Sequence, residues 1–240
     1  MPPSSHQGGS REQPVILAPA GLEGTLVLPP GAAGVVVFAH GSGSSRFSPR
    51  NREVAGALQA AGLGTLLFDL LTEGEAEDRR NVFDIPLLGG RLVAAIDHMA
   101  GHGAAGMLPV GLFGASTGAA AALTAAAARP DRVHAVVSRG GRPDLAGGEV
   151  LGRLAAPTLL IVGGSDREVL GLNESARAAM RCVSELAVVP GATHLFEEPG
   201  ALDQVSRLAA AWFLRWLAPP AGQRGGPAQG APSAGAAPGS

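Results

Sequence analysis

Ser116 stands at the centre of the pentapeptide Gly-Ala-Ser-Thr-Gly at residues 114–118. The motif follows the apolar run 110–113, which predicts a buried strand, and precedes the alanine-rich segment 119–129, which predicts a helix. A serine in the pattern G-x-S-x-G between a strand and a helix is typical of a nucleophile elbow, a tight turn that exposes the hydroxyl. A chain with 36 glycines produces such spacings by chance. The hypothesis therefore needs a base and an acid.

A serine hydroxyl is a poor nucleophile at neutral pH unless a base takes its proton. His194 is the best placed of the six histidines, because it lies between the last predicted strand and the last predicted helix and so emerges at the same sheet edge as Ser116. His40 also ends a predicted strand, but it opens a glycine-rich loop, and we expect a structural role for it. The remaining four lie in the N-terminal leader, beside a helix end or at the start of a strand: His6, His98, His102 and His134.

The acid that orients the base is expected to follow a strand between the serine and the histidine. Asp166 does so directly after the predicted strand 158–162, where it could also cap the next helix. Asp144 is the rival acid, but it lies beyond Pro143 and several residues from its strand end. We therefore predict a triad of Ser116, Asp166 and His194.

Two backbone N–H groups are needed to stabilise the oxyanion that forms when such a serine attacks a carbonyl. Thr117 supplies one by its position next to Ser116, and we assign the other to Ser42 in the loop 40–44. A dinucleotide-binding fingerprint in this loop would need its third glycine at residue 46, which is Arg46, so the loop does not match that motif. The sequence also lacks a Walker motif for binding nucleotide phosphates. Glycines at 101 and 103 break the helix that would present His98 and His102 to a metal. We expect no cofactor and no metal.

An open, mostly parallel sheet with helices on both faces would position these residues. The sequence predicts about eight strands, of which the first two form an antiparallel hairpin and the rest alternate with helices. The predicted strands are 15–18, 25–28, 34–39, 64–70, 110–113, 133–138, 158–162 and 185–189. The predicted helices are 50–61, 85–99, 117–129, 168–181 and 202–217, with a helical or irregular stretch at 145–154.

Length and composition predict one α/β domain over residues 14–218, because 46% of the 240 residues are hydrophobic and 16% are charged. Residues 1–13 are predicted to be a disordered leader, and the Ala/Gly/Pro-rich residues 219–240 a disordered tail. A net charge of −2 favours neither a nucleic acid nor a membrane partner. The single cysteine, Cys182, fits a reducing compartment, so we expect a cytoplasmic protein; the sequence leaves its oligomeric state open.

With these residues in this order, the chain resembles the α/β-hydrolase superfamily over roughly residues 15–217. The form without a large lid after the strand 133–138 looks most like the dienelactone-hydrolase branch. The segments 40–46, 68–72 and 138–144 are similar to bacterial hydrolases that occur alone or fused to phosphoribosyltransferases. Dienelactone hydrolases have a cysteine nucleophile where this chain has Ser116. The resemblance therefore implies a serine hydrolase that cleaves a small ester or lactone.

Other functions use the same residues. An acyltransferase or a thioesterase would need the same triad, and a non-catalytic binding protein could retain the fold. Arg46, Arg139 and Arg142 are predicted to lie in loops that open toward the site, where they could bind a carboxylate or phosphate of the substrate. Ordinary pairing with the acidic run 73–78 is the alternative for these arginines.

Overall fold

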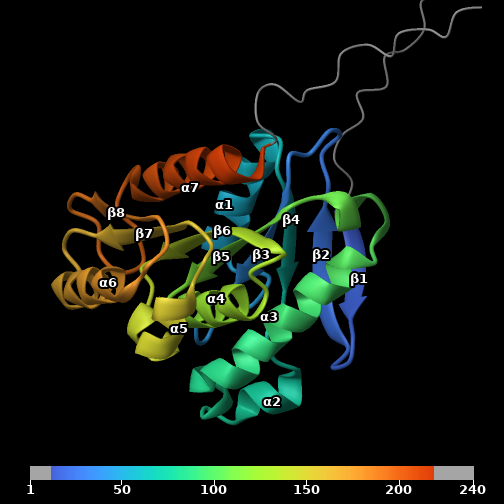
Figure 1. Cartoon of the computed structure of the whole chain (residues 1–240), viewed down its shortest axis with the longest axis horizontal. Coiled ribbons are helices and arrows are strands. Elements are labelled where there is room, and N and C mark those ends of the chain that lie inside the picture. Colours follow the sequence, from blue (N-terminus) through green and yellow to red (C-terminus); the bar gives the residue numbers. More distant parts are fainter. Residues whose placement is uncertain (1–11, 219–240) are drawn as a thin grey trace, which may run out of the picture.

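A single eight-stranded sheet organises residues 12–218, the part of the chain that the computed structural model describes (Figure 1). The strand order is β1-β2-β4-β3-β5-β6-β7-β8, with β1, β2 and β4 paired antiparallel and the other pairs parallel. The strands are β1 (Glu12–Leu17), β2 (Leu22–Val27), β3 (Val35–Ala39), β4 (Gly64–Phe68), β5 (Val110–Ala115), β6 (Val133–Arg139), β7 (Thr158–Gly163) and β8 (Ser184–Val189). The predicted hairpin and mostly parallel sheet are confirmed.

Helices cover both faces of the sheet. They are α1 (Pro49–Ala60), α2 (Glu73–Glu77), α3 (Ile85–Ala100), α4 (Thr117–Ala128), α5 (Gly148–Arg153), α6 (Arg167–Ala179) and α7 (Ala201–Leu217), with 3-10 turns at Asn81–Phe83, Gly103–Met107 and Pro143–Ala146. Figure 1 shows α1 and α7 on one face and α3, α4 and α5 on the other. Between β6 and β7 the chain forms only the 3-10 turn Pro143–Ala146 and the short helix α5. Within the described residues, no lid-sized insertion is therefore found there.

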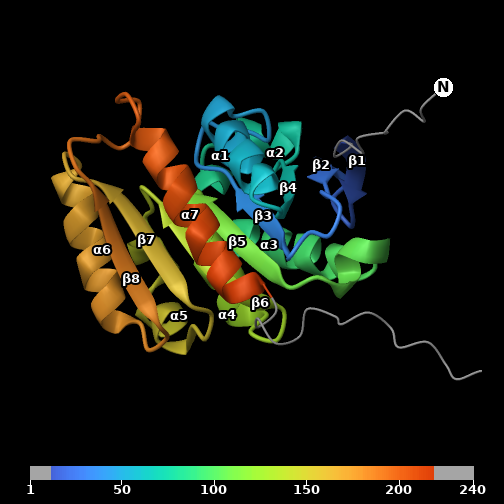
Figure 2. The ribbon, with the colours of Figure 1, turned by 90° about the horizontal axis from the view of Figure 1, so that it is seen from above.

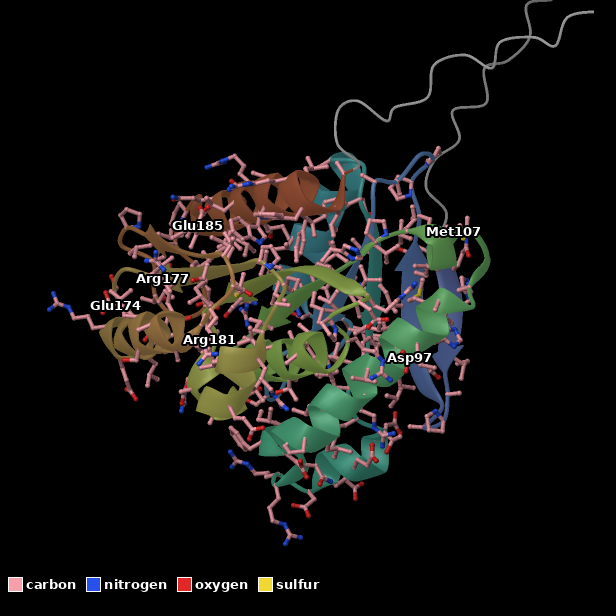
Figure 3. All side chains as sticks on the ribbon, in the orientation of Figure 1. Asp97, Met107, Glu174, Arg177, Arg181 and Glu185 are labelled. Carbon is pink, nitrogen blue, oxygen red and sulfur yellow. The ribbon has the colours of Figure 1, made fainter. Side chains whose placement is uncertain are left out.

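The two faces bury separate apolar cores. One core joins the sheet to α3, α4, α5 and α6, and the other joins it to α1 and α7. The central strand β3 is buried along its whole length, as its continuous Val-Val-Val-Phe run predicts. On α6, the buried face includes Val169 and Ala176, whereas Figure 3 shows Glu174 on the outer side, away from the sheet.

The ends of the domain differ slightly from the prediction. Strand β1 begins at Glu12, so residues 12 and 13, which the sequence assigns to a leader, belong to the sheet. The rest of that leader and the predicted tail, residues 1–11 and 219–240, lie outside the described residues. No helix between residues 12 and 218 is long and apolar enough to cross a membrane.

Helix α7 packs directly on the middle of the sheet, where Figure 2 shows it lying across the strands. Gly111 of β5 makes this close approach possible. A Cβ atom on Gly111 would lie 2.6 Å from Cε1 of Phe213 and 3.1 Å from Cδ1 of Leu217, both in α7. The absence of a side chain at residue 111 therefore sets how closely α7 can approach.

We predict that Gly111→Ala lowers the free energy of unfolding by about 1–3 kcal/mol, because the added methyl group overpacks the interface between β5 and α7. Gly56→Ala is the matched control: Gly56 is exposed within α1 and has open space around its Cα. That control should raise stability by about 0.5–1 kcal/mol. Urea denaturation measures both changes, and equal stability of Gly111→Ala and the wild type would contradict the packing argument.

Candidate active site

Ser116 occupies a strained turn between β5 and α4. Its φ of 52° and ψ of −123° are rare for a residue with a side chain. The flanking glycines are sterically required. A side chain on Gly118 would overlap carbonyl oxygens at the end of β3, and a Cβ atom on Gly114 would lie 2.5 Å from Cα of Ala119. The turn therefore has the geometry of a nucleophile elbow.

Asp166 and His194 meet at the same edge of the sheet. His194 Nδ1 lies 2.8 Å from Asp166 Oδ2, and the carboxylate is the more buried partner of the two. Asp166 occupies the N-cap position of α6, but its side chain makes no capping hydrogen bond there. A hydrogen bond from Ser165 N–H to Ala192 O, 2.9 Å long, holds the loops after β7 and β8 together. The carboxylate is thus directed to the imidazole rather than to the helix.

The loop that carries His194 reaches back over the end of β6 toward Ser116. A Cβ atom on Gly140 would lie 3.0 Å from His194 O and 3.6 Å from His194 Cε1. The residue before Gly140 accepts a hydrogen bond of 3.2 Å from the backbone N–H of Ser116. The end of β6 at Gly140 therefore contacts both the loop of His194 and the elbow at Ser116. Within residues 12–218, the Ser116 hydroxyl is not hydrogen-bonded to His194.

The rival acid, Asp144, has another partner. Arg142 Nε and Nη2 donate to its two carboxylate oxygens at 2.8 and 2.7 Å. This bidentate pair satisfies both side chains locally, within the 3-10 turn after β6.

Ser42 and Thr117, the two predicted oxyanion donors, lie next to each other. The N–H of Ser42 donates to the Thr117 hydroxyl oxygen at 3.0 Å, and Thr117 is buried. The preceding residue, Gly41, lies against the nucleophile: a Cβ atom there would be 3.0 Å from Cβ of Ser116. The loop after β3 therefore lies directly beside the elbow.

Arg46 is not free to bind an anion. Its guanidinium is paired with the carboxylates of Asp69 and Glu23, and its backbone N–H donates to Asp69 Oδ1 at 2.8 Å. These partners lie after β4 and in β2, not in the acidic run 73–78. The prediction that Arg46 is free to bind a substrate anion was therefore wrong. The alternative, that Arg46 pairs with the acidic run 73–78, was wrong as well.

Arg139 does not lie in an open loop, which corrects the prediction for this residue. It is the last residue of β6 and is 5% exposed. Its guanidinium donates to Asn51 Oδ1 at 3.3 Å and lies 5.8 Å from the ring centre of Phe196. Burial lowers the pKa of Arg139 to about 10, and the nearby charge of Arg50 contributes. Arg139 therefore remains protonated at neutral pH inside the protein.

A cavity of about 630 Å³ opens beside Thr117. It is lined by residues 21–23, 40–47 and 69–73 together with Ala76, Val82, Leu88 and Thr117, and we call it the loop cavity. Its volume lies within the range of about 300–1,000 Å³ typical of small-molecule sites.

Asn173 is a supporting residue that the sequence analysis did not single out. It lies on the buried face of α6, and its side-chain amide donates to Gly141 O at 2.9 Å and to Val169 O at 2.8 Å. The bond to Gly141 fixes the loop after β6 against α6. The sequence does carry a signal for Asn173: it is a polar residue at a position where an amphipathic helix normally has an apolar one.

Comparisons with known proteins identify the family of the chain, although no family model matches it. A crystal structure of dienelactone hydrolase from Anabaena variabilis is 54% identical, with a TM-score of 0.84, and the match covers 88% of this chain and 100% of that one. The chain belongs to the dienelactone hydrolase family of α/β-hydrolases. The predicted α/β-hydrolase fold is confirmed.

Two further proteins extend the comparison. A Mycobacterium tuberculosis protein named "Putative phosphoribosyl transferase" is 57% identical over 209 residues, which are 87% of this chain and 47% of that protein. The chain thus spans about half the length of that relative. An esterase from Pyrococcus furiosus shares the fold, with a TM-score of 0.66 and 16% identity over 87% of this chain and 92% of that one.

Within residues 12–218, no three His, Cys, Asp or Glu side chains lie together in a way that could hold a metal ion. His98 and His102 lie with their ring centres 5.7 Å apart at the end of α3.

His40 joins the loop after β3 to the loop after β4. Its Nδ1 donates to Gly41 O at 3.0 Å, and its Nε2 accepts from Leu70 N–H at 3.1 Å, so both nitrogens are engaged in the neutral form. Burial lowers the pKa of His40 below 6.5, against an opposing effect of the Asp69 charge. The structural role expected for this residue fits these bonds.

We predict that His40 makes a pH-dependent contribution to the stability of the protein. The unfolded chain binds a proton near pH 6.5, whereas the folded chain binds it only at lower pH. The stability contribution is therefore present above pH 6.5 and is lost as the pH falls toward the folded pKa. The difference in unfolding free energy between the wild type and His40→Gln should shrink from pH 7.5 to pH 5.5 in urea titrations. A constant difference would contradict the prediction.

Proposed function

We propose that the chain is a serine hydrolase that cleaves a carboxylic ester through an acyl-enzyme on Ser116. The observation that carries this proposal is the Asp166–His194 hydrogen bond beside the strained Ser116 turn. Membership of a hydrolase family supports it. Because Nδ1 of His194 bonds to the carboxylate, Nε2 is left as the basic nitrogen.

In the proposed reaction, Ser116 Oγ attacks the ester carbonyl carbon while His194 Nε2 takes the hydroxyl proton. The carbonyl oxygen becomes an oxyanion, which the N–H groups of Thr117 and Ser42 would stabilise. When the tetrahedral intermediate collapses, the bond to the alkoxy oxygen breaks and His194 delivers its proton to the leaving alcohol. Water, deprotonated in turn by His194, then releases the acid and restores Ser116.

Asp166 has a positioning role in this proposal. The ionised carboxylate holds Nδ1–H, fixes the tautomer and stabilises the imidazolium that forms during attack. The missing hydrogen bond between Ser116 and His194 is consistent with a site that tightens only when substrate binds.

We predict that a fluorophosphonate probe labels the wild-type chain and fails to label Ser116→Ala. Only an activated serine hydroxyl displaces the fluoride at an appreciable rate. Ser175→Ala is the matched control, because the hydroxyl of this exposed α6 serine donates to Gly171 O of its own helix, and its loss should leave labelling unchanged. Mass spectrometry of the labelled peptide gives the site. Absent labelling of the wild type, or labelling that persists in Ser116→Ala, would remove the proposal and favour a non-catalytic binding protein.

A second prediction separates the two candidate acids. Asp166→Asn should reduce kcat on a p-nitrophenyl ester by about 10³–10⁴-fold, because the amide no longer holds the reactive tautomer. Asp144→Asn removes only the pair with Arg142 and should change kcat less than about fivefold. The reverse ranking of the two variants would assign the acid to Asp144.

A further inference from the structure

The loop cavity lies on one definite side of the nucleophile. Its walls come from the ends of β3 and β4 and from the β1–β2 turn, and they include Ser42 and Thr117. The strand order places β4 and β3 on one side of β5, and β7 and β8, which precede Asp166 and His194, on the other. The cavity and the acid–base pair therefore flank Ser116 from opposite sides.

This arrangement indicates on which side of Ser116 the alcohol part and the acyl part of an ester would lie. His194 must reach the alkoxy oxygen to protonate it, so the alcohol lies on the side of β7 and β8. The carbonyl oxygen would point at the N–H groups of Ser42 and Thr117. The acyl chain, the remaining substituent of the carbonyl carbon, then extends into the loop cavity.

Apolar surface makes up the larger share of the walls of the loop cavity, and polar side chains make up the rest. Five aliphatic side chains line it, three of them almost fully buried: Leu22, Leu70, Leu71, Val82 and Leu88. A cavity of about 630 Å³ is far larger than an acetyl group needs. Longer acyl chains would bury more apolar surface there and so bind more tightly.

The charges of the loop cavity oppose an anionic acyl group. Arg46 contributes a guanidinium, but Asp69 and Glu23 already bind it. Glu73 adds a third carboxylate, so carboxylates outnumber guanidinium groups among the described lining residues. The neutral form of His40 adds no charge. The N-terminus of α4, which begins at Thr117, favours negative charge only at the carbonyl itself.

We propose that the loop cavity binds the acyl part of the ester and selects an uncharged, mainly apolar group longer than acetyl. This inference rests on the proposed serine hydrolase function and adds its substrate class. A carboxylate at the end of the acyl chain would lose its hydration and face Asp69 and Glu73, with no free cation among the described lining residues.

The test compares p-nitrophenyl esters that share one leaving group: the acetate, the hexanoate, the adipate monoester and the 6-(trimethylammonio)hexanoate. For the wild type, kcat/KM for the hexanoate should exceed that for the acetate by about tenfold or more. It should exceed that for the anionic adipate monoester by at least about 30-fold, because like charges in a binding site are costly. The cationic ester should fall between these two. Equal kcat/KM for the hexanoate and the adipate monoester would overturn the proposal.

Charge variants test the cause of the selectivity. The double variant Glu23→Gln/Asp69→Asn releases Arg46, so the ratio of hexanoate to adipate monoester should fall by about tenfold or more. Glu23→Gln alone keeps the Asp69 bonds and should lower the ratio by a smaller factor. Because Glu23 is exposed, this single variant serves if the double variant fails to fold. An unchanged ratio in folded variants would overturn the proposal.

Asp144→Asn is the matched control, because it releases Arg142, which does not line the loop cavity. The ester ratio should stay at the wild-type value; a fall as large as in the Glu23 and Asp69 variants would overturn the assignment to this cavity. The two proposals fail differently. A chain that labels at Ser116 and hydrolyses the acetate without preferring the hexanoate contradicts the cavity proposal alone. A chain that neither labels nor hydrolyses any ester overturns both.

Discussion

The close contact between β3, β5 and α4 at the two glycines of the elbow is the constraint on which the site depends. Gly118 lets the first turn of α4 meet the carbonyl oxygens at the end of β3, and Gly114 lets it meet the end of β5. The chain can then reverse direction within one residue, and Ser116 takes the strained φ of 52°. Such strain persists only where the surrounding packing stabilises it, and here two buried cores hold the flanking elements.

The elbow alone places one residue, and the order of the strands places the others. Parallel strands bring all their carboxyl ends to one edge, so Ser42, Asp166 and His194 converge although up to 152 residues separate them. His194 follows β8, so its loop must extend across the ends of β7 and β6 to approach Ser116 after β5. The hydrogen bond from Ser165 N–H to Ala192 O joins this loop to the loop after β7. Gly140 lets the same loop pack closely against the end of β6.

The pattern of apolar residues along the sequence predicted most of the strands and helices, because each pattern lies within a short segment of the chain. Continuous apolar runs marked the buried strands, and apolar stripes marked the helices. Helix α2 was missed although Thr72 and Glu75 form a capping box that the sequence displays; five residues without an apolar stripe gave no periodicity. The predictions for Arg46 and Arg139 failed for a different reason. Arg46 finds its partners in β2 and after β4, and burial of Arg139 depends on α1, so neither is visible in local sequence.

The hydrogen bond between Ser42 and Thr117 shows how a donor can be kept ready for the proposed reaction. In the resting state the Thr117 hydroxyl accepts from the Ser42 N–H, so this donor is already held by a neutral oxygen. An oxyanion is a stronger acceptor than a neutral hydroxyl or an ester carbonyl. Exchange of the Thr117 oxygen for substrate oxygen therefore gains little in the ground state and most when charge develops. A donor held in this way would lower the barrier rather than tighten substrate binding.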